Sequence, residues 1–468
     1  MPDRHDDVDA WLSERIEPLP PPPGTFDLIK RRARRRKYRK LAITAGTAAV
    51  IVAAAVTVPE VVSLPVLNPN PTAAPALGVA GASHSSAAPS ATSGALGQAS
   101  ESTSSAVPVS PPVPDNFRPT SVTFVGTRTG WVIGQARAPG HCATRFCTSV
   151  ARTGDAGQTW TGVPAPMAGA ADGATGLSQI RFLDLNDGWA YGPQLFSTHN
   201  GGRTWTPVDT GGMRVTALET VGNRVFAVWA SCTGSGPGYA VDCTKFTLYS
   251  APGAGGSWTP VGTSTTGLTD GRAGEAAQLV LTGSRGYLLA PGGALYAGPV
   301  DGSGPWTRAS SLSASCPVGP ARADGQPTGA LLAAVNARDL VLACASASSG
   351  ANPSVSAQQK VIYSSPDGGV SWRPMGTAPA AGVAFSLAAS PSRSVVIGTD
   401  RGIDLLPRGE MTWQLASLNP GAPSGGFGYV GMTTAEQGIA LPADPSAGTV
   451  WFTFDGGRTW APSRLNGS

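Results

Sequence analysis

The chain has 468 residues, and its 33 Lys and Arg against 29 Asp and Glu give a formal net charge of +4. All of this excess lies in residues 1–40, which hold 11 basic and 7 acidic residues. The rest of the chain has no net basic charge, which argues against a nucleic acid as its partner, because nucleic acids are attracted to broadly positive surfaces.

The first segment, residues 1–40, ends in the basic run Lys30–Lys40. Residues 41–58 follow without a charge, and as a helix they would span about 27 Å, close to the ~30 Å hydrocarbon core of a bilayer. Positive charge beside such a segment marks the cytoplasmic side. We expect a transmembrane helix at 41–58 behind a cytoplasmic tail, in a single-pass protein of the cell membrane. A nucleic-acid-binding tail and a cleaved signal peptide are the alternatives.

The next segment, residues 59–116, is dominated by Pro, Ala and Ser. A segment of this composition cannot bury enough apolar surface to form a core. Chains of this kind act as extended spacers. We therefore expect a disordered stalk that holds the following domain away from the membrane.

An octapeptide recurs through residues 117–465. It has Thr or Ser first and seventh, Asp or Asn third, Gly fifth and Trp eighth. The four intact copies run from Thr153 to Trp160, from Thr198 to Trp205, from Ser365 to Trp372 and from Thr453 to Trp460. A motif that returns at regular distances indicates one small unit copied around a larger architecture.

Weaker copies of the octapeptide end in Trp258, Trp306 and Trp413, so that seven Trp residues follow one another at intervals of 41 to 66 residues. Four-stranded propeller blades repeat every ~40–50 residues. The longest interval indicates an insertion, which we place around Cys344–Lys360.

Short apolar strands precede most of these Trp residues. Val122–Val125 with Gly130–Ile133 and Ile180–Leu183 with Gly188–Tyr191 are two such pairs, bounded by Gly, Asp and Asn turns. We therefore predict an all-β, seven-bladed β-propeller at residues 117–465, with six or eight blades as alternatives.

The octapeptide itself is predicted to be a structural turn. Asp155, Asn200, Asp367 and Asp455 are placed to accept hydrogen bonds from their own turns, while the Gly supplies a positive φ. Trp160, Trp205, Trp372 and Trp460 are each expected to bury a ring of order 150–250 Å² in the core of its blade. None of these residues is predicted to be catalytic.

The octapeptide resembles the Asp-box, or BNR, repeat of the sialidase-like propellers. That resemblance implies an arginine triad that binds a carboxylate, a Tyr–Glu nucleophile pair, an Asp that acts as the acid, and an Arg-Ile-Pro motif. The sequence contains no Arg-Ile-Pro, and neither Glu219 nor Glu275 stands in a context that indicates the nucleophile pair. No catalytic residue is therefore carried over.

A second resemblance rests on Phe182 with Gly188-Trp189 and on the copy from Asn200 to Trp205. These residues are similar to bacterial propellers of the photosystem II stability/assembly-factor type. In photosynthetic members this resemblance implies binding of a precursor protein during assembly. The tail and stalk point instead to a membrane-anchored bacterial member, so we expect the binding fold without a photosystem role.

Six cysteines all lie beyond the expected membrane segment. Proximity in the sequence suggests the pairs Cys142–Cys147, Cys232–Cys243 and Cys316–Cys344, although six cysteines allow fifteen pairings. Disulfides are typical of an extracytoplasmic domain. A zinc site is disfavoured because no His stands at finger spacing from two Cys.

Other candidate sites have simpler interpretations. His199 belongs to an octapeptide turn, and His141 stands beside Cys142 in an expected loop. Asp184, Asn186 and Asp187 could hold Ca²⁺, but an ordinary Asp/Asn turn is the favoured interpretation. The sequence has no nucleophile elbow and no phosphate-binding Gly-Lys-Ser/Thr loop. We expect neither a cofactor nor a metal.

Three functional hypotheses follow. The favoured one is a non-catalytic extracytoplasmic scaffold that binds a protein, peptide or glycan, with the loops around Arg137–Arg145 and Cys232–Cys243 as candidate surfaces. The second is a propeller glycoside hydrolase or lyase, which requires two carboxylates about 5–9.5 Å apart. The third is a membrane sensor that couples ligand binding to the cytoplasmic tail.

Overall fold

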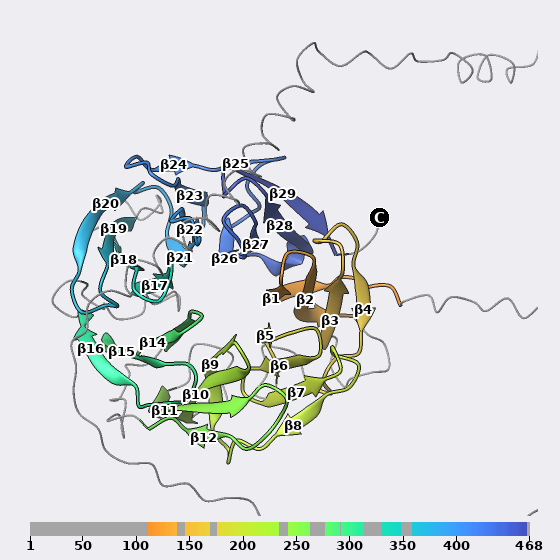
Figure 1. Cartoon of the computed structure of the whole chain (residues 1–468). Coiled ribbons are helices and arrows are strands. Elements are labelled where there is room, and N and C mark those ends of the chain that lie inside the picture. The colour runs from red at the N-terminus through yellow and green to blue at the C-terminus, as the bar shows by residue number, and fades with distance from the viewer. Residues whose placement is uncertain are drawn as a thin grey trace, which may run out of the picture. The chain divides into compact units, whose positions relative to one another are not determined.

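The computed structural model describes residues 111–137, 146–168, 176–233, 242–262, 277–290, 292–312, 316, 329–347 and 358–465. They form seven sheets arranged in a ring (Figure 1). The prediction of an all-β, seven-bladed propeller is confirmed. The expected transmembrane helix at 41–58 lies outside the described residues, and within them no helix is long and apolar enough to cross a membrane.

Each blade is a four-stranded antiparallel sheet built from consecutive strands, from the inner edge outward. The strands are β1 (Arg118–Val125), β2 (Thr129–Ala136), β3 (Cys147–Thr153) and β4 (Thr161–Val163) in blade 1; β5 (Gln179–Phe182), β6 (Asp187–Tyr191), β7 (Leu195–His199) and β8 (Thr206–Val208) in blade 2; β9 (Arg214–Val221), β10 (Arg224–Thr233), β11 (Asp242–Pro252) and β12 (Thr259–Pro260) in blade 3; β13 (Gln278–Leu281), β14 (Arg285–Leu289), β15 (Ala294–Pro299) and β16 (Thr307–Ser311) in blade 4.

The last three blades follow the same order. They contain β17 (Ala330–Ala334), β18 (Leu340–Ala347), β19 (Gln358–Ser365) and β20 (Arg373–Ala378) in blade 5; β21 (Ala384–Ala389), β22 (Val395–Thr399), β23 (Gly402–Leu406) and β24 (Gln414–Leu415) in blade 6; β26 (Phe427–Met432), β27 (Gly438–Pro442), β28 (Thr449–Thr453) and β29 (Thr459–Arg464) in blade 7. A short strand between blades, β25 (Ser417–Leu418), pairs in parallel with β29 and adds a fifth strand to blade 7.

The two faces of the ring carry different connections. Because neighbouring strands run antiparallel, first-to-second and third-to-fourth connections share one face, which carries the octapeptides and is here called the octapeptide face. The remaining connections form the loop face. Octapeptide-face connections are short throughout, whereas on the loop face β12 ends at Pro260 and β13 begins only at Gln278. The long connections between the described strands therefore lie on the loop face.

The insertion in the longest Trp interval also lies on the loop face. β16 ends at Ser311 and β17 begins at Ala330, and β18 ends at Ala347 while β19 begins at Gln358. The predicted position around Cys344–Lys360 therefore accounts for the second of these connections and missed the first. The sequence around Cys316 contains Pro and Gly and has no strand pattern, so it does not reveal that the insertion is divided between two connections.

Apolar packing joins each blade to its neighbours. The described residues form seven apolar clusters, each drawn from two adjacent blades, and each holds one Trp of the repeated series. These are Trp160, Trp205, Trp258, Trp306, Trp372, Trp413 and Trp460. Each ring therefore packs between its own blade and the adjacent one, because a single sheet has only one surface to offer it. Of the four rings expected to be buried, Trp460 is buried, whereas Trp160, Trp205 and Trp372 are only partly buried.

The ring closes by side-chain contacts between blades 7 and 1, without exchange of a strand. Trp160 Nε1 donates to Ser463 Oγ at 3.0 Å, and Ser463 Oγ donates to the carbonyl of Gly157. Gln437 Nε2 donates to the carbonyl of Thr127 at 2.9 Å. Each blade is consequently one continuous stretch of sequence, and the octapeptide of blade 1 supplies some of the contacts that close the ring.

Blades 5 and 6 share a buried ion pair. Lys360 Nζ on β19 lies 3.2 Å from Asp404 Oδ2 on β23, and the two side chains are 0% and 1% exposed. The ammonium also donates to the carbonyls of Ala381 and Gly382, both at 2.9 Å. Burial raises the pKa of the Asp404 carboxyl to about 6, and the attraction of Lys360 offsets this only in part.

Candidate functional site

The inner strands place their charge on one side of the propeller axis. Arg118, Arg181, Arg214 and Glu219 are the charged residues of the seven inner strands, and all four belong to blades 1 to 3. The inner strands of blades 4 to 7 carry none. The charged groups that the inner strands offer to a site therefore come from the first three blades.

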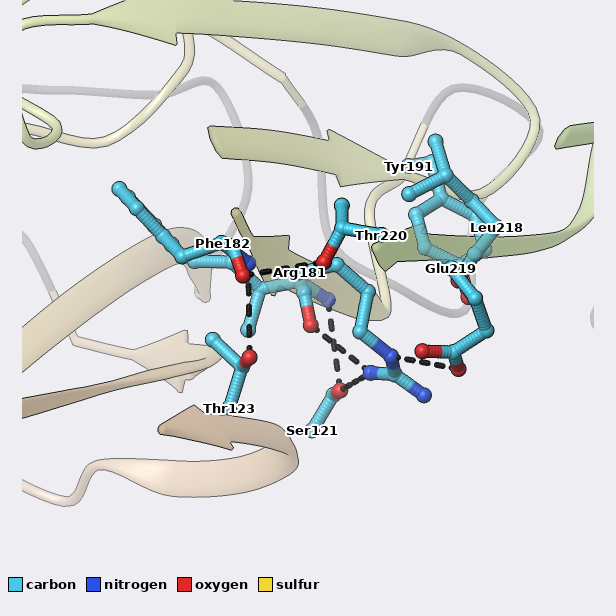
Figure 2. A network of polar contacts seen from close by, with 9 residues as sticks. Ser121, Thr123, Arg181, Phe182, Tyr191, Leu218, Glu219 and Thr220 are labelled. Atoms are coloured by element: carbon cyan, nitrogen blue, oxygen red, sulfur yellow. Dashed lines mark hydrogen bonds and ion pairs between the residues drawn. The ribbon is translucent and has the colours of Figure 1, made fainter. Parts of the chain in front are cut away.

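Arg181 and Glu219 form an ion pair between neighbouring inner strands. Arg181 Nε on β5 donates to Glu219 Oε1 on β9 at 2.8 Å, and the two side chains are 15% and 31% exposed (Figure 2). Partial burial weakens the screening of such a pair by water. The pair therefore presents a fixed arrangement of one positive and one negative group.

The guanidinium of Arg181 is held from a third strand and from its own backbone. Its Nη1 donates to Ser121 Oγ on β1 at 3.1 Å and to the carbonyl of Ile180 at 2.8 Å (Figure 2). The neighbouring amide of Phe182 donates to Thr123 Oγ1 at 3.4 Å. These bonds tie β5 to blade 1 and leave Nη2 as the terminal nitrogen that the described residues do not engage.

Two tyrosines flank the ion pair. Tyr191 Oη donates to the carbonyl of Leu218 at 3.4 Å, and burial raises its pKa to about 12. Burial likewise raises the pKa of Tyr429 on β26. For Arg181, burial acts to lower the pKa, but the carboxylate of Glu219 outweighs it and keeps the pKa above its usual value. Both tyrosines are therefore neutral and Arg181 is charged near neutral pH.

A cavity of about 140 Å³ lies beside the pair. It is lined by Val122, Thr123, Phe124, Arg181, Glu219, Tyr429, Gly431, Met432, Thr433 and Ile439. These residues lie mostly in the later halves of β1, β5, β9 and β26, toward the octapeptide face. Among the described lining residues, Arg181 and Glu219 are the only charged ones, so this lining has no net charge and is partly polar and partly apolar.

This geometry supports binding more readily than bond cleavage. Within the described lining, Glu219 is the only carboxylate, and it is already paired with Arg181. A glycoside hydrolase mechanism requires a second carboxylate facing the first across the scissile bond. The described part of the cavity therefore supplies hydrogen-bonding groups and an apolar wall, which are features of a recognition site.

The octapeptide residues lie on the face away from the loop connections. Asp367 Oδ1 accepts from the amide of Ser371 at 2.9 Å, and its Oδ2 accepts from Ser371 Oγ at 2.5 Å. These bonds lower the pKa of Asp367 to about 2. Asp155 and Asp455 make the same contacts with Thr159 and Thr459. The carboxylates thus bond to their own turns and face no shared site.

Asn200 reproduces the turn with an amide. Its Oδ1 accepts from the amide of Thr204 at 2.9 Å, and its Nδ2 donates to Thr204 Oγ1 at 2.8 Å. Beside it, His199 Nδ1 lies 2.7 Å from Asp187 Oδ1. Asp184 Oδ1 accepts from the amides of Asn186 and Asp187 at 2.7 and 2.8 Å, as in an ordinary Asp turn.

The described residues contain no group of three or more His, Cys, Asp or Glu side chains that could hold a metal ion. His141 lies outside these residues, as does most of the expected surface loop around Arg137–Arg145. The other expected loop, between Cys232 and Cys243, is described only at its two ends.

Two disulfides join elements of the loop face. Cys232 and Cys243 bridge the ends of β10 and β11, and Cys316 bridges the connection before β17 to Cys344 on β18. Both pairings agree with the prediction from proximity. Cys147 is also disulfide-bonded, and Cys142 lies outside the described residues. The covalent links thus stabilise the face that carries the long connections.

Sequence reasoning missed the role of the Arg181–Glu219 pair. The motifs of the sequence do not single out Arg181, and the context of Glu219 argues against its being part of a nucleophile pair. A signal was present, because each residue is a lone charge in an otherwise uncharged part of a first strand. Which two of the lone charges meet depends on the order of the blades around the axis, and this order follows only from the structure.

Comparisons with known proteins find similar solved structures but no related sequence. No protein-family model and no curated protein matches the sequence. Among solved structures, the chain is similar to YCF48 bound to a D1 peptide, with 16% identity over 61% of this chain and 80% of that chain, at a TM-score of 0.39. YCF48 from Cyanidioschyzon merolae is 14% identical over 65% and 87%, at a TM-score of 0.41.

A third similar structure is an ancestral GH74 enzyme. It is 13% identical over 76% of this chain, which spans 47% of the length of that enzyme, at a TM-score of 0.45. At these identities and TM-scores the similarity concerns the fold alone, and the function depends on the residues of this chain.

Proposed function

We propose that the protein is a non-catalytic binding propeller that is held outside the cell membrane and captures a protein or peptide on its loop face. The observation that carries this proposal is the asymmetry between the two faces. Long connections and both described disulfides belong to the loop face, while the octapeptide face has short, uniform turns. Binding residues concentrate on loops that a rigid scaffold positions.

The disulfides support this assignment through their position. Cys232–Cys243 links the two strand ends from which a loop-face connection of blade 3 leaves. Cys316–Cys344 fixes another loop-face connection to blade 5. A covalent link at the base of a loop lowers its conformational entropy before a ligand arrives, which reduces the entropic cost of binding.

The membrane anchor belongs to the same proposal. Residues 41–58 would cross the bilayer, residues 1–40 would remain in the cytoplasm, and residues 59–116 would connect the anchor to the propeller. The support is the uncharged segment that follows the basic run, together with cysteines confined to the later part of the chain. Cell fractionation with protease protection tests this arrangement directly: external protease should release the propeller from intact cells and spare the tail.

The binding proposal is tested by charge reversal on each face. Arg137 follows β2 on the loop face, and Arg338 lies between β17 and β18 on the octapeptide face; both are exposed. Full-length protein carrying Arg137→Glu should recover less partner from cross-linked membranes than wild type, whereas Arg338→Glu should recover as much. A partner lost only with Arg338→Glu, or no partner with wild type, would contradict the proposal.

A further inference from the structure

The cavity beside Arg181 and Glu219 has a chemistry that narrows what can occupy it. We propose that it is an anchor pocket for an uncharged primary amide, the side chain of a glutamine or asparagine in a peptide that reaches the inner strands. This proposal is separate from capture on the loop face, because the pocket lies toward the octapeptide face. The selectivity of the pocket does not depend on which residues hold the rest of the partner.

The first argument is the pairing of charge. Arg181 Nε lies 2.8 Å from Glu219 Oε1, and these two residues are the only charged ones in the described lining. A carboxylate brought into this pocket would meet Arg181 but also the negative charge of Glu219. An ammonium would be attracted by Glu219 but repelled by Arg181. Like charges at such short distances disfavour each other strongly at a partly buried site, so a neutral group is selected.

The second argument is the set of atoms left for a ligand. Arg181 uses Nε and Nη1 within the protein, while Nη2 has no hydrogen-bond partner among the described residues (Figure 2). Glu219 uses Oε1, which leaves Oε2 as an acceptor. A primary amide has one carbonyl acceptor and an NH₂ donor on adjacent positions. It can accept from Nη2 and donate to Oε2 at once.

The third argument is size. At about 140 Å³ the cavity is well below the ~300–1,000 Å³ of sites that enclose a whole drug-sized ligand. It is suited to one side chain of a larger partner. Phe124, Met432 and Ile439 offer apolar contact to the methylene groups of that side chain, and the Tyr429 hydroxyl, which has no partner among the described residues, adds a further polar contact.

The test measures selectivity among three capped peptides. N-acetyl-Gly-X-Gly-N-methylamide, with X as Gln, Glu or Lys, would be titrated into purified full-length protein and followed by saturation-transfer NMR. The three probes share the same backbone amides, so differences report the side chain alone. We expect the Gln peptide to bind at least about tenfold more tightly than either charged peptide.

A single substitution should reverse this order. Glu219→Gln keeps the shape but leaves Arg181 without its counter-ion, so the Glu peptide should now bind more tightly than the Gln peptide. Arg137→Glu, on the loop face, should leave the order of wild type unchanged even if it abolishes capture of the natural partner. The two proposals can therefore fail separately.

Four outcomes would overturn the anchor pocket. These are equal binding or no binding of the three peptides to wild type, a preference of wild type for Glu or Lys, the wild-type order persisting in a folded Glu219→Gln protein, and stronger competition by methyl β-glucoside than by the Gln peptide. The last result would assign the cavity to a sugar. The wild-type arm needs no variant, so the proposal stays testable if Glu219→Gln fails to fold.

Discussion

Trp160 and Ser463 join the first blade to the last across almost the whole length of the propeller sequence. The indole Nε1 donates to the serine Oγ at 3.0 Å, and the same hydroxyl donates to Gly157. Ser463 therefore bonds at once to the turn and to the Trp of one octapeptide. Because no strand is exchanged between blades 7 and 1, these bonds and the apolar cluster around them close the ring.

Removing the hydroxyl should loosen this closure. Ser463→Ala deletes one acceptor and one donor and leaves the Trp160 indole N–H unpaired, so we expect a loss of about 1–2 kcal/mol in the free energy of unfolding. Urea denaturation followed by Trp fluorescence would measure it. Ser424→Ala, at an exposed serine with no such bonds, serves as the control and should change stability by less than about 0.5 kcal/mol. Equal effects would argue that the contact does not contribute to closure.

Gly157 should tolerate a methyl group less well than another glycine of the same conformation. Gly157 and Gly126 have φ of +84° and +69°, but a Cβ at Gly157 would meet the Phe452 ring at 2.3 Å, while at Gly126 nothing lies within 4 Å. Gly126→Ala should cost about 1–2 kcal/mol for its backbone conformation. Gly157→Ala should cost about 1–3 kcal/mol more because the ring must move. Indistinguishable thermal midpoints would count against this interface.

The Lys360–Asp404 pair should behave as one unit. Lys360→Met alone leaves a buried carboxylate without its partner and should destabilise the fold by about 3–5 kcal/mol. The double variant Lys360→Met/Asp404→Leu removes both charges and should recover most of that loss. A double-mutant cycle from denaturation curves gives the coupling energy. Additive effects of the two substitutions would show that the groups do not interact.

Asp404 should also give stability a measurable dependence on pH. Its folded-state pKa is about 6, above the ordinary value of 3.8 for an Asp carboxyl, so between these two values the folded protein holds a proton that the unfolded chain releases. Its contribution is therefore complete below pH ~4 and is lost as the pH rises through about 6. Relative to Asp404→Asn, wild type should gain up to about 3 kcal/mol between pH 7 and pH 4. A parallel pH profile for the two proteins would contradict the raised pKa.

The sequence predicted the blade architecture because its signals are local. Alternation along strands such as β1, Gly-rich turns and a Trp in each unit all lie within one repeat, so they can be recognised without knowing what packs against what. The turn bonds of Asp367 span only four residues and could be anticipated for the same reason.

Relations between blades were harder to anticipate. How deeply each Trp ring is buried depends on the adjacent sheet, and the turn that carries the Trp does not reveal which sheet that is. Arg181 and Glu219 are 38 residues apart, and Lys360 and Asp404 lie in different blades. Each of these pairs forms only when neighbouring sheets pack in ring order. The candidate pocket also depends on that order, so the repeated motifs, which describe single blades, could not predict it.

The way the ring closes bears on the order in which the blades can follow one another along the chain. Val113 and Phe117 at the start of the described chain share one apolar cluster with Leu465 at its end. Every blade is a continuous stretch of sequence, so the same ring could be built with the chain starting at a different blade. A gene that joins these ends and opens between two other blades would encode a circular permutant with the same seven interfaces, and the loop face could then be presented from a different point of attachment.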